Sequence, residues 1–369
     1  PWLWMETKKL IDCCEFISDG DHLPPPKSDN GVPFITISNI TGQNKLSFEG
    51  TMFVPESYYD GLSENKKAQK GDILYSVVGS FGKPVYIDFD KQMVFQRHIA
   101  ILRPKRNVNA RFIYYTMLNP QFYKLVDKLA IGCSQRTVTL DTLRNIEISL
   151  PDKDIQDKTV EVLSLIDRKI DENCKINDNL QQMAYDTYMH LFWGKKPNGK
   201  LGEIIIENAK SSVQVGEAKW VKSKFPFFTS GDTILEWDCG LTNGRNCFLN
   251  TGGNAGVKFY VGEAAYSTDT WCITANGELE DYLYLLLLSI MPELSQKFFQ
   301  GTGLKHLQKP LLKDRKIYIP TSREIFDFNS KVKPWMNQIS ANSQENKYLS
   351  SLIDWLLPML MNGQAVVEG

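Results

Sequence analysis

The fold is decided by two stretches, IGCSQRTVTLDTLRNIEISLP (131–151) and QGTGLKHLQKPLLKDRKIYIP (300–320), which align without a gap at an offset of 169 residues. In both, a glycine-bearing loop (Gly132, Gly301) precedes a short polar run, an alternating strand pattern and a final proline. Few residues are identical, but the order of the features is the same. Self-similarity at a fixed offset is the signature of an internal repeat. We therefore predict two copies of one structural unit.

The same offset continues into two heptad patterns, in which apolar positions are spaced alternately by three and four residues. The seam positions are Leu163, Ile166, Ile170, Asn173, Asn177, Leu180, Ala184, Thr187 and Leu191 in the first copy, and Val332, Trp335, Ile339, Asn342, Asn346, Leu349, Ile353, Leu356 and Leu360 in the second. Asparagine falls at matching positions, and a polar seam residue costs stability but fixes the register of packed helices. We predict two long helices that pack on each other; the alternative is two unrelated amphipathic helices.

A globular segment precedes each helix, and the starts of the two segments also correspond. Residues 8–20 resemble 199–211, and Pro33 in PFITIS matches Pro226 in PFFTSG. The offset is larger here, so the second copy lacks about two dozen residues that the first contains between residues 40 and 95. The predicted order is a globular segment (1–151), a helix (152–193), a second globular segment (194–320), and a second helix with a C-terminal tail (321–369).

Local patterns give both globular segments a mixed α/β (α+β) character. Alternating or β-branched runs between Gly and Pro predict strands over 35–40, 71–79 and 85–89. Residues 110–130 and 280–299 have the pattern of helices. We interpret the aromatic runs at 114–115 and 225–228 as core rather than as platforms for stacked bases.

Composition excludes several classes of protein. The chain has 369 residues, which is longer than one hydrophobic core usually organises. Of these residues 42% are hydrophobic and 23% are charged, a composition typical of folded globular chains. No apolar run is long enough for a membrane span, and the first residues lack the basic flank of a signal peptide. Seven cysteines without a CxxC pair favour a reducing cytoplasm over a disulfide framework or a zinc site. The net charge of −1 carries no general signal for nucleic acid.

No complete catalytic constellation is visible. GKKPNGKL (194–201) nearly matches a phosphate-binding loop, but Leu201 replaces the required hydroxyl and a helix precedes it. Asp152, Asp167 and Lys169 have the spacing of a PD…DxK nuclease, yet the last two lie in a heptad helix rather than on a hairpin. Asn119-Pro120-Gln121 fails as a base-methylation motif, and the four histidines show no metal-binding spacing. We expect no catalytic residue, no metal site and no cofactor, hence a binding protein.

The arrangement resembles the specificity subunits of type I restriction–modification systems over nearly the whole chain. DGDHLPPP (19–26) with GVPFITISNI (31–40) looks like the opening of a first target-recognition domain, and GDILYSVVGSFGKPVYI (71–87) like its centre. Residues 148–170 are similar to the junction between domain and helix, 251–271 to a second recognition domain, and MNGQ (361–364) to the usual tail. Pro334 departs from the family pattern: a proline in the seam would kink the second helix or move its start.

The resemblance implies two recognition domains separated by two long antiparallel helices, which form a coiled-coil spacer in a pseudo-two-fold repeat. Each domain would read one half of a bipartite, gapped target in double-stranded DNA, and the helices would set the gap. The implied partners are methyltransferase (M) subunits and restriction/translocase (R) subunits, with the chemistry on those partners and no membrane involved. Apolar side chains on the helices could dock the methyltransferase, but Tyr185, Tyr188, Phe192, Trp193 and Trp355 could equally pack within the chain.

Loops with Gly and with Arg, Lys, Asn, Gln, Ser, Thr or His suit contact with a DNA groove, because Gly permits close approach and Arg or Asn can bond two atoms of a base. The candidates in the first domain are His22, Ser80, Lys83, Gln96, Arg97, Ser134, Gln135 and Arg136. Those in the second are Thr242, Asn243, Arg245, Asn246, Asn254, Lys258, Thr268, Thr270, Lys305 and His306. Arg136 and Lys305 stand beside the paired glycine loops and are the leading candidates. For each residue the alternative is a solvated loop or turn position.

Two other functions stay open on the sequence. One is a non-catalytic coiled-coil scaffold with two α/β modules that bind protein or RNA. The other is an enzyme whose site is not recognisable from spacing. Binding of double-stranded DNA that depends on two short sequences at a fixed distance separates the first proposal from both.

Overall fold

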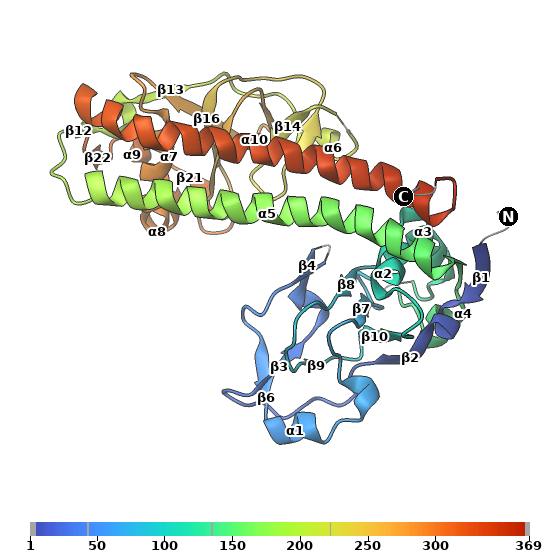
Figure 1. Cartoon of the computed structure of the whole chain (residues 1–369). Helices are drawn as coiled ribbons and strands as arrows, with labels where there is room; N and C mark the ends of the chain where they lie inside the picture. The colour runs from blue at the N-terminus through green and yellow to red at the C-terminus, as the bar shows by residue number, and fades with distance from the viewer. Residues whose placement is uncertain (1–4, 43, 134–135, 222, 366–369) are drawn as a thin grey trace. The chain divides into compact units, whose positions relative to one another are not determined.

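The computed structural model describes residues 5–42, 44–133, 136–221 and 223–365. The chain divides into two compact units: residues 1–168 with 349–369 form unit 1, and residues 169–348 form unit 2. Two 40-residue helices, α5 (Lys153–Phe192) and α10 (Ser322–Met361), each contribute to both units (Figure 1). None of the helices in the described residues has the length and apolar character that crossing a lipid bilayer requires.

The sheets of unit 1 and unit 2 correspond strand by strand. Unit 1 contains a four-stranded antiparallel sheet in the order β2 (Cys14–Asp19), β10 (Ile99–Pro104), β7 (Ile73–Ser76), β8 (Pro84–Tyr86). Unit 2 repeats it as β13 (Ile205–Glu207), β19 (Thr270–Ala275), β16 (Arg245–Asn250), β17 (Val257–Val261). A two-stranded pair closes each globular segment: β1 (Met5–Lys9) with β11 (Glu147–Pro151), and β12 (Gly199–Lys200) with β22 (Lys316–Ile317).

A second sheet carries the matched prolines. In unit 1, β3 (Val32–Ile35) lies antiparallel to β6 (Met52–Val54) and parallel to β9 (Val94–Phe95). In unit 2, β14 (Phe225–Phe228) lies antiparallel to β15 (Leu235–Trp237) and parallel to β18 (Ala265–Tyr266). Pro33 and Pro226 are the second residues of β3 and β14 and pair with Phe53 and Glu236. The predicted duplication therefore extends to strand direction and register.

The surplus residues of the first copy form additional elements between β3 and β7. The chain there makes the 3₁₀ turn η2 (Ile37–Asn39), the hairpin of β4 (Ile40–Gly42) with β5 (Lys45–Leu46), the helix α1 (Glu56–Asp60) and the turn η3 (Glu64–Lys66). In unit 2 the connections from β14 to β16 are short. The prediction of one strand over 35–40 was wrong, because Asn39 accepts hydrogen bonds from the backbone N–H and the hydroxyl of Thr36 and so turns the chain after Ile35.

The remaining helices also occur in matching places, with shorter segments than the patterns predicted. Residues 110–130 form two helices, α2 (Ala110–Leu118) and α3 (Pro120–Leu129), because Asn119 ends the first and its side chain caps the second at Gln121. Residues 280–299 divide into α7 (Glu280–Ser289), α8 (Met291–Glu293) and the π-turn η5 (Leu294–Phe298). The other elements are α4 (Leu140–Asn145), α6 (Val215–Ala218), α9 (Lys309–Lys313), η1 (Leu10–Cys13), η4 (Leu201–Glu203) and the pair β20 (Phe299–Gln300) with β21 (His306–Leu307).

Most of the aromatic residues that the sequence analysis assigned to the core are buried. Tyr114, Tyr115, Phe227 and Phe228 are all enclosed, and only Phe225 of that run is half-buried. A large apolar cluster lies in unit 2, where Ala184, Tyr188 and Phe192 of α5 pack with the apolar residues of α7 and with Ile325, Phe328 and Val332 of α10. The C-terminal half of α5 is thus part of the core of unit 2.

Helices α5 and α10 begin and end at positions that differ by the predicted offset. All the seam positions are buried or half-buried, as expected for packed helices.

Pro334 does not start or end α10, which begins at Ser322 and continues past it. A capping box fixes that start: the Thr321 hydroxyl accepts from the Glu324 N–H at 3.4 Å, and the Glu324 carboxylate accepts from the Thr321 N–H at 2.8 Å. The buried neighbours Val332 and Met336 anchor the turn that contains the proline and offset its missing N–H donor.

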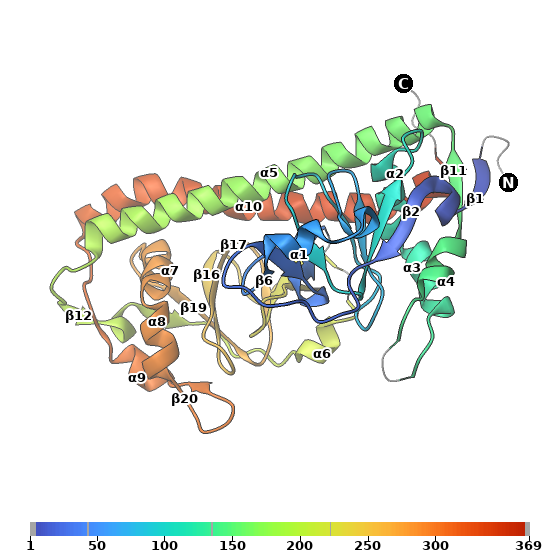
Figure 2. The ribbon, with the colours of Figure 1, turned by 90° about the horizontal axis from the view of Figure 1, so that it is seen from below.

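Within unit 2 the two helices run antiparallel (Figures 1 and 2). They meet at the predicted asparagines. Asn173 Nδ2 donates to Asn346 Oδ1 at 2.8 Å, and Asn342 Nδ2 donates to Asn177 Oδ1 at 2.8 Å. Because the helices are antiparallel, each asparagine bonds the repeat equivalent of its neighbour rather than its own equivalent. The two bonds are therefore related by the pseudo-two-fold repeat.

We expect Asn177→Ala and Asn342→Ala each to lower the free energy of unfolding by about 1–3 kcal/mol, because each leaves the partner amide without its hydrogen bond. The double variant should show a coupling energy of about 1 kcal/mol in urea unfolding. Asp178→Ala and Lys331→Ala, exposed residues on the same helices, provide an additive control cycle. Additivity of the asparagine cycle would contradict a direct bond between the two side chains.

Candidate nucleic-acid interface

Four loops of unit 1 meet at one edge of its four-stranded sheet, and we name them the first edge: residues 20–31, 77–83, 96–98 and the described part of 130–138. Backbone hydrogen bonds connect them. The Val77 N–H donates to the His98 carbonyl at 3.0 Å, and the Arg97 N–H donates to the Asp21 carbonyl at 3.0 Å. The Gly79 N–H donates to the Arg136 carbonyl at 2.9 Å. The first edge is a single surface built from segments far apart in the sequence.

The corresponding loops of unit 2 form the second edge: residues 208–214, 251–256, 267–269 and 300–306. The Thr251 N–H donates to the Asp269 carbonyl at 3.2 Å, and the Thr268 N–H donates to the Val213 carbonyl at 2.9 Å. The Gly253 N–H donates to the Lys305 carbonyl at 2.9 Å. Each of these bonds has its counterpart in the first edge, so both units present loops on the same backbone frame. Arg136 and Lys305, the leading candidates, occupy equivalent places in it.

Six of the eight candidates in the first domain lie on the first edge. Among them, Lys83 and Arg97 make no ion pair with any described residue, and Arg97 donates from Nε to His98 Nε2 at 3.4 Å. Burial, and then the nearby Arg97 charge, lower the pKa of His98, which favours the neutral ring that can accept this bond. His22 contacts the Asp19 carboxylate at 2.7 Å, and Ser80 and Gln96 lie on the adjacent loops. Ser134 and Gln135 lie outside the described residues.

Arg136 has a structural role as well as a place on the first edge. Its guanidinium bonds the Asp127 carboxylate and carbonyl and lies 3.5 Å from the Ala130 carbonyl, so that it covers the C-terminal end of α3. It also lies 5.8 Å from the centre of the Phe81 ring. The loop from 77 to 83 and the end of α3 are thereby held together, and base contact by Arg136 would compete with these bonds.

The second edge contains four of the ten candidates of the second domain, and a fifth, Lys258, reaches it from β17. Asn254, Lys305 and His306 are exposed, and Thr268 is half-buried. Lys258 reaches the edge from β17 and donates from Nζ to the Thr229 carbonyl at 2.9 Å. Thr270 is buried and bonds the Phe228 carbonyl and the Ser267 hydroxyl, so it supports the edge from below.

The other four candidates, Thr242, Asn243, Arg245 and Asn246, lie at the opposite end of β16 from the second edge. Arg245 bonds the fully buried carboxylate of Asp281 at 2.9 Å and the amide oxygen of Asn337 on α10 at 2.6 Å. Asn246 is also buried. The local sequence NGRN has the composition of a groove-binding loop, but the carboxylate on α7 that holds the arginine is too distant in the chain for spacing to reveal. We leave these four out of the proposed reading set.

A cluster of three lysines near the second edge was not identified from the sequence. Lys309 and Lys313 of α9 lie 4.8 and 5.8 Å from the centre of the Trp271 ring, and Lys313 pairs with Glu207. Burial lowers the pKa of Lys309; Glu207 raises it, while Lys313 and Lys210, as like charges, lower it. The third lysine is Lys210, so the cluster is built from two segments, the loop after β13 and α9, that meet only in the fold. Such cations suit contact with DNA phosphates.

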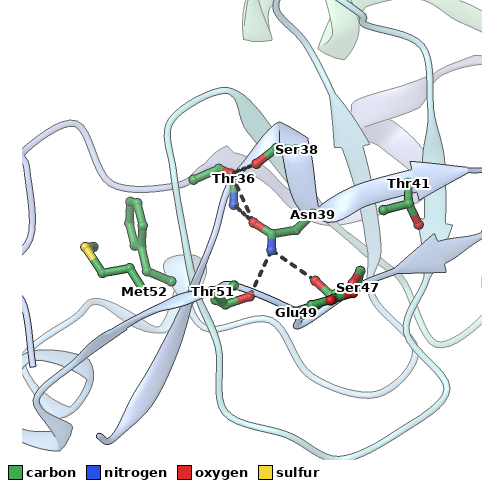
Figure 3. A pocket seen from close by; sticks show the side chains of 10 residues that line it. Thr36, Ser38, Asn39, Thr41, Ser47, Glu49, Thr51 and Met52 are labelled. Atoms are coloured by element: carbon green, nitrogen blue, oxygen red, sulfur yellow. Dashed lines mark hydrogen bonds between the residues drawn. The ribbon is translucent and has the colours of Figure 1, made fainter. Parts of the chain in front are cut away.

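A pocket of about 520 Å³ lies in the additional elements of the first copy (Figure 3). Six of its ten lining residues have a hydroxyl or amide side chain. Some of these bond one another or the backbone: Asn39 Nδ2 donates to the Ser47 carbonyl and to the Thr51 hydroxyl. Thr36 follows Ile35, whose carbonyl accepts from the Gln96 N–H at 2.9 Å. The pocket therefore adjoins the first edge, and the second copy has no corresponding segment.

The residues of the two look-alike catalytic motifs have other partners. In GKKPNGKL, Lys195 pairs with Glu324 and Lys200 with Asp314. Asp167 lies on α5 and accepts a hydrogen bond from the Tyr115 hydroxyl at 2.6 Å. Within the described residues, no three His, Cys, Asp or Glu side chains group closely enough to hold a metal ion.

Comparison with known families identifies the chain. Residues 4–182 and 193–346 each match the family described as "Type I restriction modification DNA specificity domain". The chain belongs to this family, and it contains two copies of the domain. The two matches coincide with the internal repeat.

The chain is similar to three curated specificity subunits. It is 25% identical over 201 residues to the type I restriction enzyme MjaVIII specificity subunit of Methanocaldococcus jannaschii, covering 53% of this chain and 46% of the relative. The HindI specificity subunit of Haemophilus influenzae is 26% identical, with 34% and 29% covered. The MjaIX specificity subunit of M. jannaschii is 22% identical, with 72% and 71% covered. The match thus spans less than half of the length of the first two relatives.

Among solved structures, the S subunit of a type I restriction–modification system from M. genitalium aligns over 98% of this chain and 97% of its own, with a TM-score of 0.63 and 15% identity. The likeness shows the shared fold. The predicted fold class, a mixed α/β chain with two repeated domains and two long helices, is confirmed.

We predict that Arg245→Leu destabilises the chain by about 3–5 kcal/mol, because the buried Asp281 carboxylate loses its partner. Burial raises the pKa of Asp281, and Arg245 opposes this rise. A raised carboxyl pKa means that the folded chain binds the proton more tightly than the unfolded chain, so stability falls as pH rises. The loss should therefore be larger at pH 7 than at pH 5. Unfolding at both pH values, with exposed Arg323→Leu as the control, measures it; equal stability of the two variants would contradict a structural role.

Proposed function

We propose that this chain is the DNA-specificity subunit of a type I restriction–modification complex, in which each edge reads one half of a bipartite, gapped target in double-stranded DNA. The observation that carries the proposal is the pair of edges. The same backbone bonds, Gly79 to Arg136 and Gly253 to Lys305, present different side chains in the two units. The same backbone arrangement with two different sets of side chains suits two different half-sites. The similar proteins are named specificity subunits, which agrees with this role.

The proposed reading residues are those that the edges expose. They are His22, Ser80, Lys83, Gln96, Arg97 and Arg136 on the first edge, with Ser134 and Gln135 retained from the sequence, and Asn254, Lys258, Thr268, Lys305 and His306 on the second. We further propose Lys210, Lys309 and Lys313 as phosphate contacts. In this scheme the recognition domains are residues 1–151 and 194–320, and the segments 152–193 and 321–369 are spacers.

The helices would set the gap between the half-sites and dock the partner subunits. Forty residues at a rise of 1.5 Å extend about 60 Å, which exceeds one turn of DNA at about 34–36 Å. Trp355 on α10 and Trp193, just beyond the end of α5, are exposed, whereas Tyr188 and Phe192 are buried in the core. We propose that Trp193 in unit 2 and Trp355 in unit 1 each contribute to a separate contact with methyltransferase subunits. Restriction subunits would join the complex, with no catalysis by this chain, and the complex would act in the cytoplasm where the DNA lies.

The first experiment is a methylome. Co-expression of this chain with its methyltransferase partner in a methylation-free host should yield one gapped motif, which disappears when this chain is omitted. A folded, cofactor-loaded partner that modifies no DNA in the presence of this chain would favour the scaffold alternative.

Arg97→Ala should relax base preference in one half-site and Lys305→Ala in the other, each by about tenfold at one or two positions. The measurement is binding of the complex to DNA libraries in which one half-site at a time is randomised. Arg323→Ala, an exposed arginine at the start of α10, is the control. Loss at both half-sites in either variant would contradict the division of reading between the edges.

A further inference from the structure

The hairpin loop at the centre of each edge is held by a buried polar side chain beneath it. Ser76 is the last residue of β7 and Asn250 the last residue of β16, and both are buried. β7 and β16 hold the same place in the two four-stranded sheets. The loops that follow, 77–83 and 251–256, are parts of the first and second edges.

Both side chains bond the carbonyl four residues ahead. The Ser76 hydroxyl donates to the Ser80 carbonyl at 3.1 Å and accepts from the Lys83 N–H at 3.0 Å. Asn250 Nδ2 donates to the Asn254 carbonyl at 3.0 Å, and the Asn250 N–H donates to the Gly256 carbonyl at 3.0 Å. Ser80 and Asn254 are exposed residues of the two edges, so the buried side chain fixes the backbone that carries them.

The second loop has an additional component. Asn250 Oδ1 accepts from Lys258 Nζ at 3.2 Å, and the same ammonium donates to the Thr229 carbonyl. Lys258 makes no ion pair with any described residue, and burial lowers its pKa. The loop backbone also packs directly on the amide, since a Cβ on Gly256 would lie 2.6 Å from Asn250 Nδ2. A serine can donate its hydroxyl to the loop, as Ser76 does, but its side chain is too short to reach the lysine as well.

We infer that Ser76 and Asn250 are specificity-determining positioning residues: they contact no base, but each sets the conformation of the hairpin loop with which its domain reads DNA. Asn250 additionally fixes the direction from which the Lys258 ammonium approaches the second half-site. The inference rests on the proposed function and goes beyond it, because it assigns base preference to residues buried below the interface.

The test uses the full chain in complex with its methyltransferase and DNA libraries with each half-site randomised in turn. Asn250→Ala should relax base preference about tenfold in the half-site read by the second domain and leave the other half-site unchanged. Ser76→Ala should do the reverse. Asn250→Ser replaces the amide with a hydroxyl that can still donate to the loop but does not reach Lys258, so it should restore part of the preference that Asn250→Ala loses. Asn329→Ala is the matched control: it is a buried asparagine of unit 2 that donates to the Glu278 carbonyl, outside the second edge.

The outcomes distinguish the inference from the proposed function. If the unaltered complex selects no bipartite motif, the proposed function fails. If it selects one, and Asn250→Ala and Ser76→Ala change preference no more than Asn329→Ala at matched melting temperature, the inference is overturned. If Asn250→Ala fails to fold, the Asn250→Ser and Ser76→Ala variants decide, since loss confined to the expected half-site supports the inference and unchanged preference overturns it.

Discussion

The seam between α5 and α10 is the constraint on which the rest of unit 2 depends. Asn173 bonds Asn346 and Asn177 bonds Asn342 across the interface between the two helices. A heptad slip would place these amides against apolar residues, at the cost of buried groups without hydrogen bonds. The register is therefore fixed, and with it the place of Ala184, Tyr188 and Phe192, which enter the core of the second domain. Because the two bonds are related by the internal repeat, each helix contributes the same pair of asparagines to fixing the register.

The two copies of the repeat share the backbone frame of the edges and differ in the side chains that the frame presents. Backbone hydrogen bonds among four loops build each edge, and backbone groups are present whatever the side chains are. The side chains can then differ: Ser76 and Asn250 hold loops of different length, and only the first copy adds the segment with Asn39 at its centre. A frame that tolerates such differences is suited to a protein whose two domains bind different sequences.

Much of the fold could be predicted from the sequence, because periodicity and offsets report on packing directly. The seam asparagines, the repeat and the order of elements follow from patterns that extend over many residues. Local breaks were harder: Asn119 divides one helical pattern and Asn39 ends one strand pattern through single side-chain bonds. Pro334 has the opposite effect: its local pattern predicts a break or a later start that the helix does not have. The capping box at Thr321 and the buried neighbours of the proline outweigh its local cost.

The candidate site is less predictable, since the role of a polar residue depends on partners distant in the sequence. Arg245 at the beginning of β16 and Lys258 within β17 are both basic residues, and the sequence alone makes both of them candidates for DNA contact. Arg245 meets the buried Asp281 carboxylate and becomes part of the core. Lys258 donates to the neutral oxygens of Thr229 and Asn250, forms no ion pair with any described residue, and is offset only by the more distant charge of Asp232. A half-buried cation without an ion pair attracts anionic groups more strongly than a paired one. The distinction between the two lies in whether α7 places an acid within reach, which only the tertiary structure decides.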